Sequence, residues 1–139
     1  TPVQYLIGEW DFLDLQGLRV RRPCLCPRPE TEEMAEMVLE ASRGWEALHE
    51  APAERPKAVF RALDIGSGTG ALGLALMYRW VYGLGHDHVR LTSVDINPEA
   101  CQLTAENAEH FGLRSKVDVV EGSFEAFCEG RSPPPGKFD

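Results

Sequence analysis

The sequence has no long apolar run, and none of its segments approaches the roughly 18 apolar residues that a membrane-spanning helix needs. We therefore expect no membrane association. It also has no stretch with the basic start and apolar centre of a signal peptide. Because the first residue is Thr1 rather than methionine, this second absence leaves the compartment open.

Basic side chains are scarce: 14 Lys and Arg stand against 22 Asp and Glu, for a net charge of −8. Nucleic-acid-binding proteins usually present a basic face to the phosphates, so direct nucleic-acid binding is not expected. The four cysteines match no zinc-ligand spacing, and we expect no metal site. They are interpreted as reduced, structural thiols of an intracellular protein, and Cys24-x-Cys26 alternates as strand residues do.

The first 31 residues are predicted to form a β-hairpin and linker. Val3, Tyr5 and Ile7 alternate, Trp10 and Phe12 resume the alternation, and Gly17 then turns the chain into a second short strand at 18–21. Thr31 is a natural helix N-cap, so a helix is expected from Glu32 to Leu48. We place the domain boundary here, with 32–139 forming the N-terminal half of the main domain.

Strands and helices alternate in the remainder of the chain. After a polar connection at 49–57, a helix should present Leu72, Leu76 and Trp80 on one face, and another should be capped by Asn97 and end near Gly112. This order predicts an α/β fold with a parallel, Rossmann-like sheet. Its strands are expected at 58–65, 89–94 and 117–120, with a fourth beginning at Phe138-Asp139.

A glycine-rich loop follows the first of these strands and leads into a helix. Gly66, Gly68 and Gly70 leave no side chains where backbone must approach a ligand. Such a loop serves either a dinucleotide or S-adenosylmethionine. Asp64 resembles the first residue of the Asp-x-Gly-x-Gly-x-Gly pattern of methyltransferases and suits the cationic amino group of S-adenosylmethionine. A loose G-x-G-x-x-A match keeps a dinucleotide open as an alternative ligand. A glycine turn with no ligand is the third alternative. The predicted contacts are Asp64, Gly66, Ser67, Gly68, Thr69 and Gly70.

Two further positions extend the predicted cofactor site. Asp95 ends the second strand, where a carboxylate can accept hydrogen bonds from both ribose hydroxyls, although it also suits the start of the next helix. Ser123 and Phe124 follow the third strand, at the place where the adenine should lie. The alternative is that Phe124 is simply a core residue. His86 and His88 are expected to be exposed in a loop.

The segments Pro2–Glu9, Asp11-Phe12 and Pro27–Glu32 resemble the HemK/PrmC family. Members are S-adenosylmethionine-dependent protein-(glutamine-N5) methyltransferases, which modify the glutamine of the Gly-Gly-Gln motif in class I peptide chain release factors. The resemblance implies a class I methyltransferase fold, a release factor as partner, and a cytoplasmic or organellar location. It places Arg28, Glu30 and Thr31 beside the substrate. Two departures are Ser123, where the family usually has an acidic residue, and the small thiols of Cys24 and Cys26.

The family's Asn-Pro-Pro-Tyr motif, which holds the substrate glutamine, would follow the strand that begins at Phe138-Asp139 and is not present in residues 1–139. No catalytic residue is therefore assigned, and the fold is expected to be incomplete, with 58–65 as an open apolar edge. We expect residues 1–139 alone to be inactive and poorly stable. Two other functions stay open: methylation of another protein glutamine or a nucleobase amine, and a non-catalytic cofactor-binding module.

Overall fold

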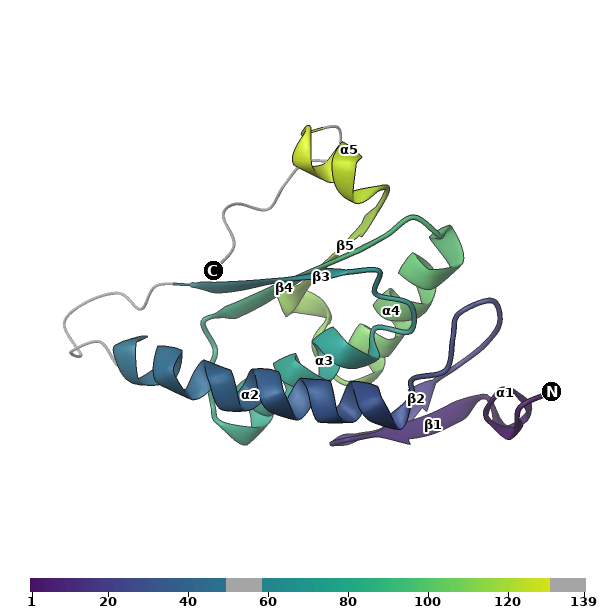
Figure 1. Cartoon of the computed structure of the whole chain (residues 1–139), viewed down its shortest axis with the longest axis horizontal. Helices are drawn as coiled ribbons and strands as arrows, with labels where there is room; N and C mark the ends of the chain where they lie inside the picture. The colour runs from purple at the N-terminus through teal and green to yellow at the C-terminus, as the bar shows by residue number, and fades with distance from the viewer. Residues whose placement is uncertain (50–58, 131–139) are drawn as a thin grey trace.

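The computed structural model describes residues 1–49 and 59–130 (Figure 1). A short helix and a β-hairpin come first, a long helix follows, and strands then alternate with helices. In chain order the elements are α1 (Val3–Ile7), β1 (Glu9–Phe12), β2 (Leu15–Arg19), α2 (Pro29–His49), β3 (Phe60–Ile65), α3 (Ala71–Tyr78), the π-helix η1 (Arg79–Gly83), β4 (Val89–Asp95), α4 (Pro98–His110), the 3-10 turn η2 (Arg114–Lys116), β5 (Val117–Glu121) and α5 (Phe124–Cys128).

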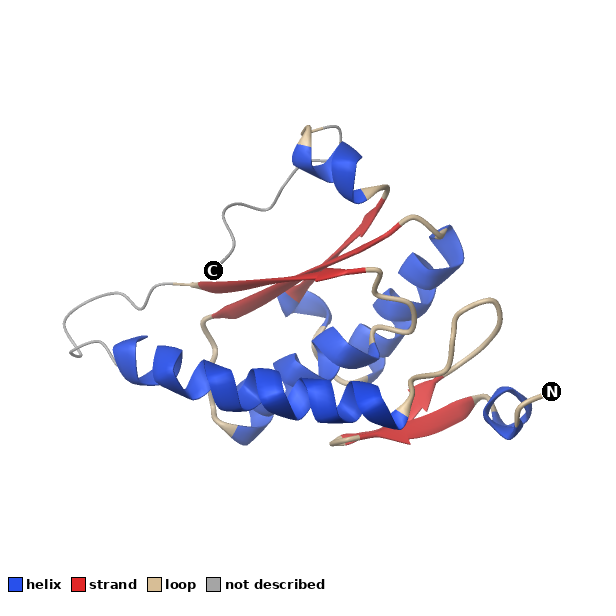
Figure 2. Ribbon diagram, in the orientation of Figure 1, coloured by secondary structure: helices blue, strands red, loops and turns tan. Residues whose placement is uncertain are grey.

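The main sheet is parallel, with the order β3-β4-β5. Figure 2 shows α2, α3 and α4 on one side of this sheet. Since the strands are parallel, their carboxyl ends share one edge, which faces the loop after β2 (Figure 1). The predicted Rossmann-like α/β fold is confirmed. Among the described residues β3 pairs only with β4, and the strand expected at Phe138-Asp139 lies outside them.

Helix α3 is at the centre of the core. Its residues Leu74 and Met77 are fully buried, and the core that they join also contains Phe12 and Leu18 of the hairpin. Gly73 allows this close packing, because a Cβ at that position would lie 2.8 Å from Leu91 of β4. The hairpin therefore packs into the same hydrophobic core as the sheet.

The prediction of an extended segment at 3–7 is wrong, because Val3–Ile7 is a helical turn that ends at Gly8 in the left-handed conformation. A five-residue stretch satisfies both the strand and the helix period, and its alternation marked no buried face: Val3 and Ile7 are more than half exposed. The hairpin itself is confirmed at β1 and β2, but the predicted turn at Gly17 is wrong: the chain turns at Leu13-Asp14, and Gly17 lies inside β2. Cys24 and Cys26, in contrast, lie in a loop rather than a strand.

Helix α2 begins at Pro29 rather than after an N-cap at Thr31. Proline is favoured in the first turn because its missing N–H needs no partner there, and the Thr31 N–H donates to the Arg28 carbonyl at 3.0 Å. The expected exposure of His86 and His88 is also wrong. Both are half-buried, with their rings edge to face at 5.3 Å. The predicted connection at 49–57 lies almost wholly outside the described residues.

Candidate functional site: a cavity at the carboxyl ends of the strands

A cavity of about 560 Å³ opens where β3 and β4 end. One wall is the glycine loop (residues 66–70) with Asp64 and Asp95. The other is the loop after β2, residues 20–28, which we call the cover segment. Its residues 23–28 line the cavity, as do Thr31 and Met34 of α2. The structure thus brings together, around one space, segments that are distant in the sequence.

The glycine loop has a backbone shape that few other residues would tolerate. Gly66, Gly68 and Gly70 all have positive φ, at 74°, 55° and 84°. A Cβ on Gly66 or Gly68 would meet no atom within 4 Å, so backbone at these two positions borders open space. A Cβ on Gly70 would instead lie 3.1 Å from Thr104 of α4. The first two glycines therefore allow close approach of a ligand, and the third allows close approach of a helix.

The hydroxyls of the loop stabilise the loop itself. Thr69 is buried, and its Oγ1 accepts a hydrogen bond from the Ala71 N–H at 3.2 Å, at the start of α3. Ser67 is also buried, and its Oγ lies 3.2 Å from the Thr104 hydroxyl. Their side chains are thus already engaged, and it is the backbone of the loop that faces the cavity.

Asp95 connects the end of β4 to the glycine loop. Its Oδ2 accepts a hydrogen bond from the Gly68 N–H at 3.0 Å, and its Oδ1 accepts one from the Asn97 N–H at 2.9 Å. The alternative that Asp95 supports the start of α4 is confirmed, and the carboxylate also lines the cavity. A carboxylate has about four acceptor positions, so two remain for hydroxyl donors.

Asp64 lies at the back of the cavity. Its Oδ2 is buried and has no hydrogen-bond partner in the described residues. Burial raises the pKa of this carboxyl, the nearby backbone of Gly73 in α3 lowers it, and the charge of Asp95 raises it further. Because Asp64 and Asp95 both line the cavity, their charges favour a cationic ligand group over an anionic one.

A smaller, apolar hollow of about 260 Å³ adjoins the main cavity at Ile65, Gly66 and Asp95. Phe124 lines it and is 43% exposed, so it is not a core residue. Ile96 lines it as well and is 73% exposed. Exposed apolar side chains around a hollow suit a flat ring.

Ser123 borders the same hollow, and its Oγ caps α5 by accepting a hydrogen bond from the Ala126 N–H at 3.0 Å. A serine at this position therefore has a local structural role. Of the residues predicted to lie near a substrate, Arg28 and Thr31 line the main cavity, whereas Glu30 is exposed and does not.

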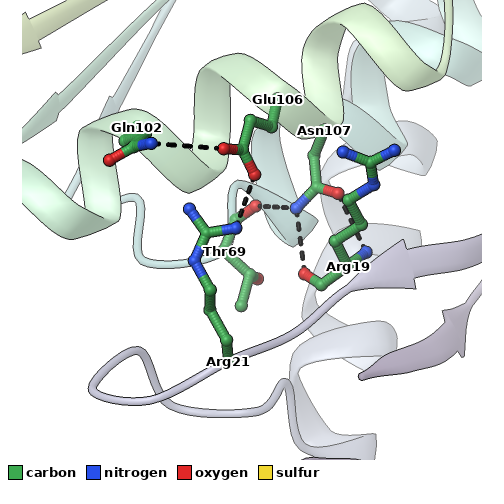
Figure 3. Close-up of polar contacts among 6 residues, drawn as sticks. All are labelled: Arg19, Arg21, Thr69, Gln102, Glu106 and Asn107. Atoms are coloured by element: carbon green, nitrogen blue, oxygen red, sulfur yellow. Dashed lines mark hydrogen bonds and ion pairs between the residues drawn. The ribbon is translucent and has the colours of Figure 1, made fainter. Parts of the chain in front are cut away.

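The cover segment is held from two sides. The Tyr5 hydroxyl of α1 donates to the Cys24 carbonyl at 2.8 Å and accepts from the Cys26 N–H at 3.0 Å. At its start, Arg21 forms an ion pair with Glu106 of α4 (Figure 3). Burial raises the pKa of both thiols, and that of Cys24 is raised further by Asp95, so these cysteines are poor nucleophiles. All four cysteines are free.

Sequence reasoning missed three groups of residues around the site. One is the cover segment, whose position depends on contacts with α1 and α4. A second is Ile96, whose position between Asp95 and Asn97, directly after the second strand, could have indicated that it borders the site. The third is the pair Thr104 and Asn107, buried polar residues on α4 whose spacing of three places them on one helix face.

Neither a metal site nor a membrane span emerges from the described part of the chain. Residues 1–49 and 59–130 contain no group of three or more His, Cys, Asp or Glu side chains arranged to hold a metal ion. None of the helices in these ranges combines the length and the apolar character needed to cross a bilayer.

Comparisons with known proteins agree with this geometry. Among curated proteins, the chain is 36% identical over 119 residues to the human MTRF1L release factor glutamine methyltransferase, covering 86% of this chain and 32% of that protein. It is 34% identical over 144 residues to the release factor glutamine methyltransferase of Lactococcus lactis, covering 99% of this chain and 45% of that protein. The chain thus spans about a third to under half of the length of these relatives.

Among solved structures, the N-terminal domain of human METTL16 matches with a TM-score of 0.59 at 14% identity, covering 88% of this chain and 43% of that one. This likeness concerns the fold alone. The family model described as "Methyltransferase domain" matches residues 57–139, which include the glycine loop, Asp95 and Phe124. On this match, and with the resemblance to release factor glutamine methyltransferases confirmed at the level of sequence, the chain belongs to the methyltransferase domain family.

Proposed function

We propose that the chain is the cofactor-binding part of an S-adenosylmethionine-dependent methyltransferase that methylates the side-chain amide nitrogen of the glutamine in the Gly-Gly-Gln motif of class I peptide chain release factors. The observation that carries the cofactor assignment is that two carboxylate residues, Asp64 and Asp95, line the cavity beside the glycine loop. A dinucleotide pyrophosphate would bring negative charge towards two carboxylates, whereas the ammonium group of S-adenosylmethionine complements them.

The residues present fit this cofactor along its whole length. Asp64 would face the ammonium group, and the glycine loop would lie beneath the methionine portion and the ribose. Asp95 would accept hydrogen bonds from the two ribose hydroxyls with the positions that Gly68 and Asn97 leave free. The adenine would occupy the apolar hollow beside Ile96 and Phe124. The bound cofactor supplies an electrophilic methyl group.

The contribution of this chain to the reaction is therefore binding and orientation. The walls of the cavity would hold the cofactor in one position, which removes the entropic cost of aligning the methyl group with an incoming nitrogen. Arg28 and Thr31 lie on the cavity lining and are the residues of this chain proposed to border the substrate. The relatives named for release factor methylation support the substrate. We propose an intracellular location in a compartment that contains such release factors.

A chimera tests the proposed substrate. Residues 1–139 replace the matching segment of the Lactococcus lactis release factor glutamine methyltransferase, and methylation of a class I release factor is followed by peptide mass spectrometry. We expect one added methyl group on the Gly-Gly-Gln glutamine, and none when that glutamine is alanine or when the chimera carries Asp95→Ala. A chimera that binds S-adenosylmethionine but leaves this glutamine unmodified would contradict the proposed substrate.

A further inference from the structure

Helix α4 contacts both walls of the cavity through one group of side chains. Asn107 is completely buried, and three of the four hydrogen-bonding positions of its amide are occupied (Figure 3). Its Oδ1 accepts from the Arg19 N–H at 2.9 Å, and its Nδ2 donates to the Arg19 carbonyl at 3.1 Å. The second Nδ2 hydrogen goes to the Thr69 carbonyl at 2.8 Å. A single amide therefore connects β2, where the cover segment begins, to the glycine loop.

The neighbouring residues on α4 reinforce this connection. One turn earlier, the Thr104 hydroxyl lies 3.1 Å from the Gly68 carbonyl, so two residues of α4 hold consecutive carbonyls of the glycine loop. Glu106 pairs with Arg21 and accepts a hydrogen bond from Gln102 at 3.4 Å (Figure 3). The glycine loop and the cover segment are thus fastened to the same two turns of one helix.

Only an amide of this length satisfies the pattern at position 107. An aspartate would place carboxylate oxygens against the carbonyls of Arg19 and Thr69, which are acceptors themselves. A leucine of similar volume would remove a partner from three backbone groups, of which the Thr69 carbonyl is buried. Core packing alone would not demand an asparagine here.

From these contacts we infer that Asn107, assisted by Glu106, is a positioning residue that sets the separation between the glycine loop and the cover segment, and thereby the affinity of the cavity for its ligand. Neither residue lines the cavity, so the effect reaches the ligand through the two walls. The part of this inference that concerns S-adenosylmethionine rests on the proposed function, whereas the part that concerns the cover segment does not.

The inference is tested with Asn107→Leu in the 139-residue chain. The first measurement is the rate at which iodoacetamide alkylates Cys24, which is 5% exposed in the cover segment, relative to the exposed Cys128. We expect Asn107→Leu to raise this ratio at least about tenfold, and hydrogen exchange of the Arg19 amide to accelerate. The second measurement is S-adenosylmethionine affinity by calorimetry, which should fall at least about tenfold, equivalent to about 1.4 kcal/mol.

Leu113→Ala is the matched control, because Leu113 is fully buried in the main core but lines neither cavity wall. It should lower the melting temperature while leaving the alkylation ratio and the affinity within about twofold. Glu106→Gln breaks only the partly exposed ion pair with Arg21, so it decides the question if Asn107→Leu does not fold. It should raise Cys24 alkylation several-fold at an unchanged melting temperature.

The outcomes separate the inference from the proposed function. An alkylation ratio that is unchanged in Asn107→Leu, or in Glu106→Gln where only that variant folds, overturns the inference. So does a change in Leu113→Ala as large as that in Asn107→Leu. If the unaltered chain binds no S-adenosylmethionine but Cys24 responds as expected, the proposed cofactor fails and the positioning role of Asn107 stands.

Discussion

Replacing Asp95 with asparagine should weaken S-adenosylmethionine binding about tenfold to a hundredfold. The carboxylate accepts hydrogen bonds from the Gly68 N–H at 3.0 Å and the Asn97 N–H at 2.9 Å. An amide has one oxygen, so it can serve only one of these donors, and its NH2 group must face the other. Losing a hydrogen bond to a charged acceptor costs about 1.5–3 kcal/mol, and each 1.4 kcal/mol is a factor of ten in affinity.

Calorimetric titration of S-adenosylmethionine into the 139-residue chain measures this change, with thermal unfolding recorded in parallel. Asp118→Asn provides the control, because Asp118 makes an exposed ion pair with Arg90 on the neighbouring strands, and exposed pairs contribute less than about 1 kcal/mol. It should leave the affinity within about twofold. An Asp95→Asn chain that binds as tightly as the Asp118→Asn chain would show that Asp95 only supports α4.

Three further predictions follow from the site and the core. Burial raises the pKa of Asp64, so between its ordinary and raised pKa the folded chain binds more protons than the unfolded chain, and stability should fall as the pH rises through this window. In urea unfolding at several pH values, Asp64→Asn should flatten the dependence of the unfolding free energy on pH. It should also abolish the gain in S-adenosylmethionine affinity that is expected as the carboxyl ionises. An unchanged pH dependence would rule out this role. Phe124→Ala should weaken S-adenosylmethionine binding by about 1–3 kcal/mol, the usual value of stacking a base on an aromatic ring. Fluorescence competition with adenosine measures this change, and an unchanged affinity would show that the adenine does not bind beside Phe124. Leu74→Ala should cost about 2–5 kcal/mol of unfolding free energy by urea titration, because the side chain is fully buried; a cost below 1 kcal/mol would contradict the placement of α3 in the core.

The features that could be predicted from sequence are those with local signals. The glycine loop lies between a strand and a helix as its pattern required, and Asn97 caps α4 with Pro98 after it, its side chain accepting from the Glu99 N–H at 2.9 Å. The alternation of strands and helices predicted the parallel sheet, because a helix that connects two neighbouring strands of one sheet normally returns the chain so that the strands run parallel. The glycine loop and the Asn97 cap have signals within a few residues of chain, and the sheet follows from the order of such local elements.

The features that were missed depend on distant partners. The segment Val3–Ile7 forms a helix whose Tyr5 hydroxyl holds the cover segment, and no pattern within five residues reveals a partner nineteen residues away. Asn107 of α4 was also missed, because its two partners, Arg19 and Thr69, lie 88 and 38 residues away along the chain. Their convergence is a property of tertiary packing.

The most direct test of the central claim is calorimetry of the unaltered 139-residue chain with S-adenosylmethionine and, separately, with NAD. S-adenosylmethionine would place a cationic group near Asp64 and carries no phosphate, so we expect it to bind saturably with one site per chain. NAD would bring its phosphates towards the two carboxylates, so we expect no measurable binding of NAD. Binding of NAD without binding of S-adenosylmethionine would contradict the account, because the glycine loop would then serve a dinucleotide.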